Sequence, residues 1–376
     1  MSQGAIPSKA APGPSDVSQA PSPPDLHPQQ GPPRSVWRSR RLWVGVLFSV
    51  ACLVLAMVDI NYREVAATLR SASLAWMVAA GLTVLVTGVA KAVRWRYLLY
   101  PGDRHSSGDE HRLGTARLSN IWMAGASVNL AVPVLRSGDL LRAYFAGDAG
   151  GLSKSRVLGT VAAEKLLDLI MLAAFLVGLV LFVALPDELA SRQGPILVVT
   201  LFMTITVAVV LWQRDRIFRL LEGVVARLPG GVAGPALSTA ARAVDGLEGL
   251  RQPRRLAMLV VISVAIWSLS AVTNYVVFLA LHMEASWVQA FFLMVVLQAG
   301  VALPSSPGKI GVFQVLCRWA LGIFGVSASL GLAYGVALYV AAPLALMVTG
   351  AIALAFEGWR AGRLPADMGS SLSTGA

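Results

Sequence analysis

The chain has 376 residues, of which 56% are hydrophobic and only 14% are charged, against about 25% charged residues in an ordinary soluble domain. This composition and a mean hydropathy of +0.66 exclude an ordinary soluble protein and indicate a multi-pass membrane protein. The formal net charge of +11 is then explained by membrane topology, so we expect no nucleic-acid partner.

The two ends of the chain differ in composition from the region between them. Residues 1–35 are rich in Pro, Ser, Gln and Gly and cannot build a core, so we predict a disordered cytoplasmic tail. Residues 361–376 are predicted as a second disordered tail. The first apolar run begins at Leu42, too far into the chain for a cleaved signal peptide. Residues 36–360 are therefore expected to form one transmembrane domain.

Six apolar runs are long enough to span a membrane as helices. They comprise residues 42–58, 74–93, 157–185, 195–212, 256–281 and 328–356. Two further runs, 118–135 and 287–303, are interrupted by Pro133 and Pro304. Lipid offers no water to a freed backbone N–H or C=O group, so we predict that these runs are re-entrant hairpins lining a cavity. The predicted fold class is an all-α polytopic membrane protein with about six transmembrane helices and two re-entrant broken hairpins.

The arginines predict the orientation of the chain. They concentrate before residue 42, in the connections within 94–156 and in 213–255, with Arg94 taken as the first loop residue after the second span. The connections poor in net positive charge are residues 59–73, 186–194 and 282–286. The positive-inside rule then places both termini in the cytoplasm, provided that neither hairpin crosses the membrane. The amphipathic segment 213–255 either lies on the cytoplasmic leaflet or packs on the bundle as a helical connector.

The two broken runs resemble each other. NLAVP (129–133) and GVALP (300–304) are separated by the same number of residues as 157–185 and 328–356. Each half, about 42–185 and 195–356, then reads span, span, hairpin, span. Three crossings per half make the second half inverted, an arrangement that recurs in transporters. The alternative is a coincidence between two apolar sequences.

Ionisable residues in or near spans are expensive and mark candidate functional sites. RSGDLLR contributes Arg136, Asp139 and Arg142, and the apolar run after it contributes Glu164 and Asp168 on one helix face. The second break contributes a third cluster, which consists of Ser305, Ser306, Gly308, Lys309 and Gln314.

These clusters predict a binding site for the phosphate of a lipid head group. Arginines can grip phosphate bidentately, Lys309 can act as a point charge, and helix N-termini after the breaks add N–H donors. Glu164 and Asp168 would orient the arginines, read a cationic head group or relay protons. The competing interpretation is structural, with Arg142 paired to Glu164 to hold the hairpin.

The sequence contains none of the common motifs for nucleotide binding or for hydrolysis by a serine nucleophile. The sequence contains no Walker A segment, no G-x-G-x-x-G opening a helix and no G-x-S-x-G elbow. The cysteines, Cys52 and Cys317, and the histidines have no metal-ligand or disulfide spacing. We expect no cofactor, no metal and no separate catalytic domain.

Three segments, RSGDLLRAYF, GLSKSRVLGTVAAEKLLDLIML and LPSSPGKIGVFQ, resemble the flippase-like membrane module of the lysylphosphatidylglycerol synthase family. The resemblance extends over about residues 40–360 and implies the lipid-translocating half in a bacterial-type inner membrane, without the soluble aminoacyl-transfer domain. Family members often read PGGxGxxE where this chain has Lys309 and Gln314, so the anionic end of the turn is lost and a cation is gained.

The sequence therefore predicts a membrane lipid-binding protein that moves an anionic phospholipid or a lipid-linked intermediate between leaflets. Membrane lipids are the expected partners. Two alternatives remain. One is a membrane-embedded transferase acting on a lipid phosphate, in which Asp139, Glu164 and Asp168 would be catalytic. The other is a docking partner for lipid-modifying enzymes, bound through 213–255.

Overall fold

The structure is a computed structural model of the chain. It describes residues 40–100, 112–132, 137–182, 253–284, 286–300 and 307–362. These residues form helices joined by short connections, with no strand among them. The predicted tail 1–35, nearly all of 361–376, the span 195–212 and most of the segment 213–255 lie outside the described residues.

Three described helical stretches are long and apolar enough to cross a membrane: Leu74–Leu99, Arg254–Ala280 and Ala328–Arg360. A fourth crossing results if helix α1 (Arg40–Met57) and helix α2 (Tyr62–Arg70) count as one span. Helix α3 occupies Leu74–Leu99 and helix α11 occupies Pro253–Ala280. Continuous apolar sequence favours helix here because only an internally hydrogen-bonded backbone is stable in lipid.

Helix α2 lies in a segment that the sequence analysis treats as a loop. Its axis is bent by 92° from that of α1. Asn61 caps it, because the side-chain oxygen accepts hydrogen bonds from the backbone N–H groups of Arg63 (3.1 Å) and Glu64 (3.4 Å). Glu64 in the first turn and Arg70 in the last turn complement the helix dipole. The connection at 59–73 therefore contains a helix that the sequence analysis did not predict.

The two broken runs form two pairs of packed helices. Helix α4 (Thr115–Ala131) packs against α5 (Ser137–Gly150), and α12 (Trp287–Gly300) packs against α13 (Val312–Gly322). The break in the first pair lies outside the described residues. In the second, only its end is described, as the short 3-10 helix η5 (Pro307–Lys309).

The last predicted span, 328–356, is helical but contains an irregular turn. Helix α14 (Ala328–Tyr339) leads into the π-helix η6 (Val340–Leu344), which leads into α15 (Ala345–Ala361). Pro343 lies within η6 and has no N–H to donate, which explains the wider turn at this point.

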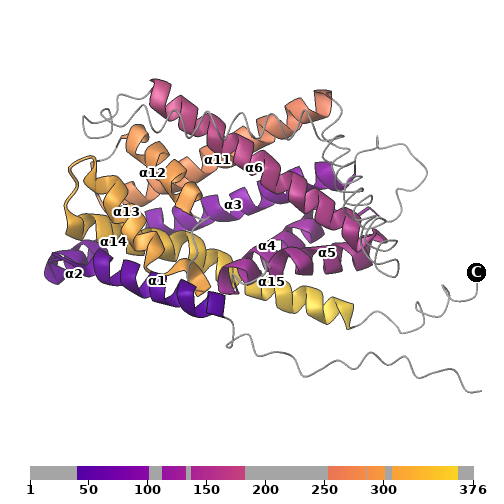
Figure 1. Ribbon diagram of the computed structural model, residues 1–376, viewed down its shortest axis with the longest axis horizontal. Helices are drawn as coiled ribbons and strands as arrows, with labels where there is room; N and C mark the ends of the chain where they lie inside the picture. Colours follow the sequence, from indigo (N-terminus) through magenta and orange to yellow (C-terminus); the bar gives the residue numbers. More distant parts are fainter. Residues whose placement is uncertain are drawn as a thin grey trace, which may run out of the picture. The chain divides into compact units, whose positions relative to one another are not determined.

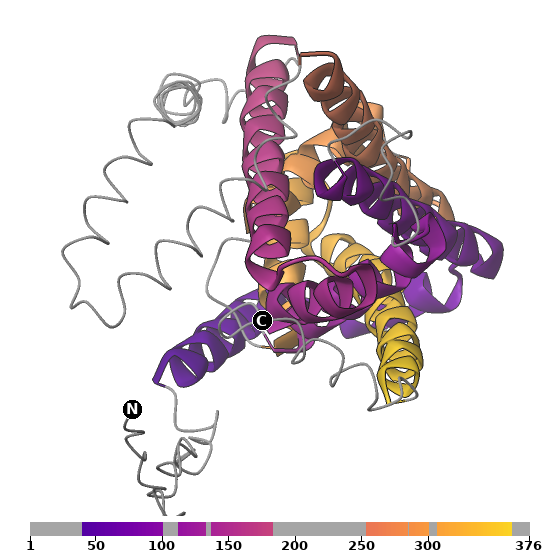
Figure 2. The ribbon, with the colours of Figure 1, turned by 90° about the vertical axis from the view of Figure 1, so that its right-hand side faces the viewer.

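The most extensive packing between helices joins α3 to α11 and α4 to α15. Helix α6 (Lys154–Phe182) contacts α3, α5, α11 and α12. The α4–α5 hairpin therefore lies between α6 and α15, which Figure 1 and the perpendicular view in Figure 2 both show.

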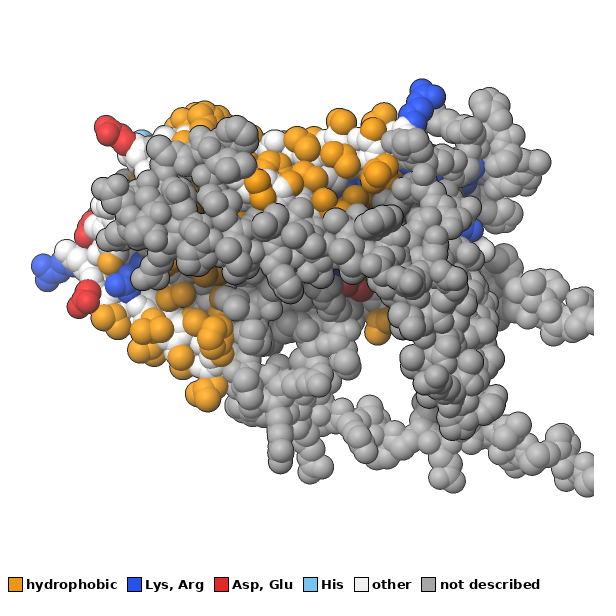
Figure 3. All heavy atoms as spheres, turned by 45° about the horizontal axis from the view of Figure 1, so that its top comes forward, with side chains coloured by type: hydrophobic (Ala, Val, Ile, Leu, Met, Phe, Trp, Pro, Cys, Tyr) orange, Lys and Arg blue, Asp and Glu red, His pale blue; other side chains and the backbone are white. Residues whose placement is uncertain are grey.

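Large hydrophobic side chains remain exposed on the outside of the bundle. Val261 on α11 is 63% exposed and Ile352 on α15 is 66% exposed. Among the described residues visible in Figure 3, hydrophobic side chains form a band between the charged side chains, most of which lie toward the left and the right of the view. Such a band suits the hydrocarbon core of a bilayer.

Candidate functional site

A buried ion pair ties the first hairpin to α6. Arg142 Nη2 on α5 donates to Glu164 Oε2 on α6 at 2.6 Å, and both side chains are at most 3% exposed. Trp122 Nε1 donates to the other oxygen of Glu164 at 3.3 Å. The Arg142 guanidinium lies 4.2 Å from the ring centroid of Trp95, in cation–π geometry. The predicted pairing of Arg142 with Glu164 is confirmed.

A second arginine joins this network from α3. Arg94 is fully buried, and its Nη2 lies 2.8 Å from Asp168 Oδ1 and 3.8 Å from Glu164 Oε1. Its Nη1 donates to Ser263 Oγ on α11 at 3.0 Å. The prediction that Arg94 begins a cytoplasmic loop is wrong. The helix continues to Leu99, because the side chains after Arg94 are largely apolar and several of them are buried.

Asp139 is engaged within the hairpin. Asn129 Nδ2 on α4 donates to Asp139 Oδ1 at 2.9 Å, and Gly138 N donates to Asn129 Oδ1 at 2.9 Å. Asp139 Oδ1 also lies 3.8 Å from Arg142 Nη1. Asn129 thus binds the first turn of α5 to the end of α4. Arg136 lies outside the described residues, so its predicted role stays a prediction.

Between the two hairpins lies a cavity of about 270 Å³. Its lining comes from α3, α4, α11, α12, η5, α13 and the α14–α15 stretch. The polar residues among the lining are Thr87, Lys91, Ser270, Thr273, Asn274, Gln298 and Lys309. The described lining contains two lysines and no Asp or Glu. The cavity therefore presents positive charge next to apolar and hydroxyl-bearing surface.

Lys309 and Gly308 reach this cavity from the second break. Both have a left-handed backbone, with φ of 58° for Lys309 and 77° for Gly308. Tyr339 donates its hydroxyl to the carbonyl oxygen of Gly308 at 2.8 Å, which fixes the turn. Glycine suits the position because the φ is positive and because an added Cβ would meet the Tyr339 oxygen at 2.8 Å.

Gln314, another predicted residue of the second break, does not line the described cavity. Gln314 is buried, and its Oε1 accepts a hydrogen bond from Gly311 N at 2.8 Å, so it caps α13. Ser305 and Ser306 lie outside the described residues. Their contact with a head group stays a prediction.

Lys91 is a cavity residue that the sequence analysis did not single out. Its ammonium lies 5.3 Å from the ring centroid of Trp122. No residue that the structure describes forms a close ion pair with it. The sequence could have indicated this residue, because Lys91 is ionisable and lies inside the predicted span 74–93, and such residues mark candidate functional sites.

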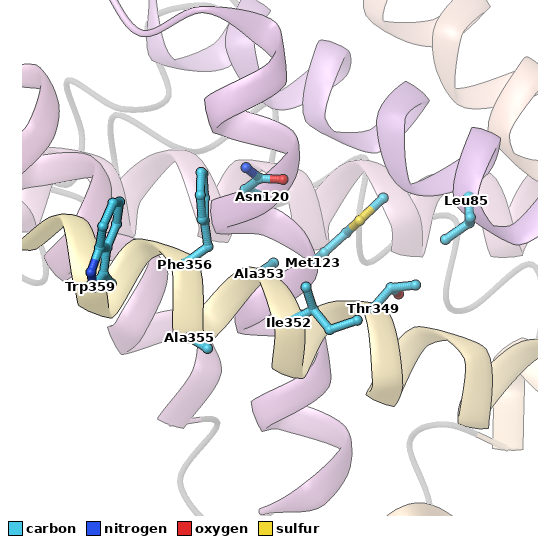
Figure 4. Close-up of a pocket in the computed structure, with 9 residues that line it drawn as sticks. All are labelled: Leu85, Asn120, Met123, Thr349, Ile352, Ala353, Ala355, Phe356 and Trp359. Atoms are coloured by element: carbon cyan, nitrogen blue, oxygen red, sulfur yellow. The ribbon is translucent and has the colours of Figure 1, made fainter.

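A second hollow is an open apolar groove of about 710 Å³ between α3, α4 and α15. Figure 4 shows Met123, Ile352, Phe356 and Trp359 along it, with Asn120 on α4 as one of its few polar residues. The apolar lining suits a hydrocarbon chain. In the described part of the chain, no cluster of His, Cys, Asp and Glu side chains could hold a metal ion.

The apolar helices, the two hairpins and the cation-lined cavity define a multi-pass helical membrane protein. The chain belongs to the family described as the lysylphosphatidylglycerol synthase TM region, whose model matches residues 42–354. A UPF0104 membrane protein of Methanothermobacter thermautotrophicus is 21% identical over 270 residues, which cover 67% of this chain and 75% of that protein. The resemblance inferred from the sequence motifs is thereby confirmed.

Proposed function

We propose that this protein binds the phosphate-bearing head group of an anionic lipid in the cavity between the hairpins and moves the lipid between leaflets. The observation that carries the proposal is the lining of the cavity, with Lys91 and Lys309 on it and no carboxylate among its described residues. Positive charge at membrane depth is costly to desolvate, so a cavity lined by two lysines favours an anion.

In this proposal the cations have two different roles. Lys91 and Lys309 neutralise the phosphate as point charges. Arg94 and Arg142 hold the first hairpin through Asp168 and Glu164, at 2.8 Å and 2.6 Å. The proposed head-group site also includes Arg136, Ser305 and Ser306. The sequence places these residues in the two breaks, outside the described part of the chain.

The proposal includes an architecture of six spans and two re-entrant hairpins in an inverted repeat. The contacts support it, because α3 and α11 would be equivalent and pack on each other. The equivalent contacts of α4 with α15 and of α12 with α6 are both present. The protein would lie in the inner membrane. Its two termini would lie in the cytoplasm, because the arginine-rich connections favour that side.

Transport fits the described carboxylates better than group transfer does. A catalytic carboxylate needs access to a substrate, whereas Glu164 and Asp139 are buried and hydrogen-bonded to neighbouring side chains. Asp168 is 28% exposed, but its Oδ1 lies 2.8 Å from Arg94 Nη2. The apolar groove beside the cavity-lining helices offers a place for an acyl chain during transfer.

The test is a flipping assay in proteoliposomes that contain a fluorescent anionic phospholipid. Lys91→Ala and Lys309→Ala should fold as wild type does and should lower the flipping rate at least about tenfold, since a lost charge-assisted contact removes on the order of 1.5–3 kcal/mol. Lys154→Ala is the matched control, because Lys154 is 53% exposed and lies outside the cavity. Wild-type rates in both cavity variants would refute the proposal.

A further inference from the structure

The last span is shared between the two hairpins. Helix α14 packs most extensively on α13 of the second hairpin, whereas α15 packs most extensively on α4 of the first hairpin. The π-helix η6 joins α14 to α15, and its residues Ala342 and Pro343 line the cavity. A single span therefore connects both hairpins, and it is irregular at the level of the cavity.

Glycines allow α14 to approach α13 closely. A Cβ added at Gly331 would lie 3.1 Å from the Cα atom of Arg318, and a Cβ added at Gly335 would lie 3.1 Å from Cys317 Cβ. Helices in such close contact have little room to slide, because a small shift brings packed atoms into overlap. Helices α13 and α14 are therefore treated as one unit, the hinged pair.

On the other side of η6, α15 is held closely against α4. A Cβ added at Gly350 would collide with Ser127 Cβ and would lie 2.5 Å from the carbonyl oxygen of Met123. Ser127 Oγ also donates to the carbonyl oxygen of Met347 at 3.2 Å. Helices α4 and α15 form a second unit, the fixed pair.

Buried ion pairing holds the fixed pair in place through the rest of the first hairpin. Helix α5 packs on α4 and is joined to α6 by the Arg142–Glu164 pair at 2.6 Å. In the proposed inverted repeat, α6 is the counterpart of the last span, yet it runs as one α-helix from Lys154 to Phe182. The irregular turn is therefore a feature of the second half of the chain and not of its counterpart in the first.

The last span can bend at η6 at a lower cost than elsewhere along its length. Pro343 has no N–H group, so the hydrogen bond that this residue would donate to the preceding turn is absent. Prolines and π-turns are also the places where helices kink. Tyr339, the residue before η6, donates its hydroxyl to the Gly308 carbonyl oxygen at 2.8 Å, which keeps the turn of the second hairpin at the pivot.

A buried hydrogen bond holds α14 in its described position. Tyr334 is fully buried and donates its hydroxyl to the carbonyl oxygen of Asn274 on α11 at 2.8 Å. Tyr334 precedes Val340 by six residues, which is about 9 Å of helix at 1.5 Å per residue. A tilt of α14 away from α11 must break this bond, so Tyr334 acts as a latch on the described state.

We infer that η6 is a hinge about which the hinged pair tilts relative to the fixed pair, and that this tilt opens the cavity toward residues 323–327, where α13 joins α14. The turn at Gly308 stays at the pivot while the far ends of α13 and α14 move, as in transporters that gate around a fixed site. The inference rests on the proposed function and adds the moving part to it.

Double electron–electron resonance on the full chain in lipid nanodiscs measures the tilt. One spin-label pair joins the two units, with Trp319→Cys on α13 and Val348→Cys on α15, both at exposed positions. A reference pair combines Val348→Cys with Leu140→Cys, an exposed position on α5 of the fixed hairpin. Wild type should show two distance populations for the first pair and a single population for the reference pair.

Two variants should shift these populations in opposite directions. Pro343→Ala restores a backbone N–H at the hinge, so it should leave one population for the first pair and lower the flipping rate at least about tenfold. Tyr334→Phe removes the latch and should raise the ratio of the second population to the first about fivefold, as expected for one lost hydrogen bond. Tyr334 does not line the cavity, so its effect cannot come from altered lipid contact.

Pro253→Ala is the matched control. Pro253 is the first residue of α11, where the missing N–H breaks no hydrogen bond within the helix. This variant should keep the wild-type distances and the wild-type flipping rate.

The outcomes separate the hinge from the function beneath it. One identical population for the first pair in wild type, Tyr334→Phe and Pro343→Ala would overturn the hinge, and two populations in the reference pair would show that the first hairpin is not fixed. Wild-type protein that shows both populations but flips no anionic phospholipid in proteoliposomes would overturn the proposed function and leave the hinge standing.

Discussion

At the scale of single residues, the Arg142–Glu164 pair allows a sharp test of structural against ligand-binding roles. Arg142→Met leaves the buried Glu164 carboxylate without its partner at 2.6 Å, which should cost about 3–5 kcal/mol of stability. Adding Glu164→Gln removes the stranded charge while keeping an oxygen for Trp122. The double variant should therefore be more stable than Arg142→Met alone. Thermal unfolding in detergent, without added lipid, measures both.

Lys154→Met is the matched control for this cycle, because the Lys154–Asp148 pair at 3.4 Å is about half exposed. Exposed pairs contribute little, so this variant should lose less than about 1 kcal/mol. If Arg142→Met unfolds like wild type, the ion pair does not hold the hairpin, and Arg142 is available to contact a ligand.

The sequence anticipates one half of this network and misses the other. Glu164 and Asp168 lie four residues apart on one helix face, which predicts two cationic partners, and Arg142 is found as one of them. The second partner, Arg94, was missed because the hydropathy run ends at Val93 and a charge there resembles a loop. The aromatic and apolar residues from Trp95 to Leu99 were the signal that the helix continues.

At the scale of helices, the α4–α5 hairpin depends on a close approach of backbones. A Cβ built on Gly138 would collide with the carbonyl oxygen of Gly125 and would lie 2.8 Å from Asn129 N. Gly138→Ala must therefore push α5 away from α4, at a cost of about 1–3 kcal/mol for overpacking. Its melting temperature should fall below that of wild type.

Gly178→Ala is the control for this prediction, because a Cβ at Gly178 on α6 meets nothing within 4 Å. It should be neutral or stabilising by up to about 1 kcal/mol through helix propensity. Equal melting temperatures for the two variants would mean that α4 and α5 do not pack as closely as described.

Helix breaks were easier to predict than helix starts. Prolines cannot continue a helix without loss, and helices α4 and α12 end shortly before Pro133 and Pro304, at Ala131 and Gly300. That the two hairpins are re-entrant stays a prediction. Helix α2 was missed because its polar sequence resembles a loop, although Asn61 followed by Glu64 is a capping signal. The π-turn at Pro343 was missed because Val340–Leu344 keeps the hydropathy of a span.

At the scale of the whole molecule, hydropathy predicts the class of protein, and contacts between distant segments determine its site. Lys91 and Lys309 are far apart in the sequence, and only the packing of α3 against α11 and of the hairpins around them brings both to one cavity. Periodicity within one helix carries no information about such a meeting. The prediction of a shared cavity therefore depended on the proposed equivalence of the two broken runs, and not on either run alone.

The inverted-repeat architecture makes a topological prediction that cysteine labelling can test. Gly114 precedes α4, and Asp148, which is 43% exposed, lies near the end of α5, so these two residues flank the first hairpin. If the hairpin is re-entrant, Gly114→Cys and Asp148→Cys lie on the same cytoplasmic side. A membrane-impermeant maleimide should then label neither in intact cells and both in opened cells, while Ala67→Cys on α2 should be labelled in intact cells.

The native protein supplies the background for this experiment, because Cys52 is 6% exposed and Cys317 is fully buried. Labelling of Asp148→Cys but not Gly114→Cys in intact cells would mean that α4 and α5 together cross the membrane. The first half would then have an even number of crossings, the second half would start on the same side of the membrane as the first, and the two halves could not be inverted relative to each other. The cavity between the hairpins would in that case need a different account of how a head group reaches it from either side.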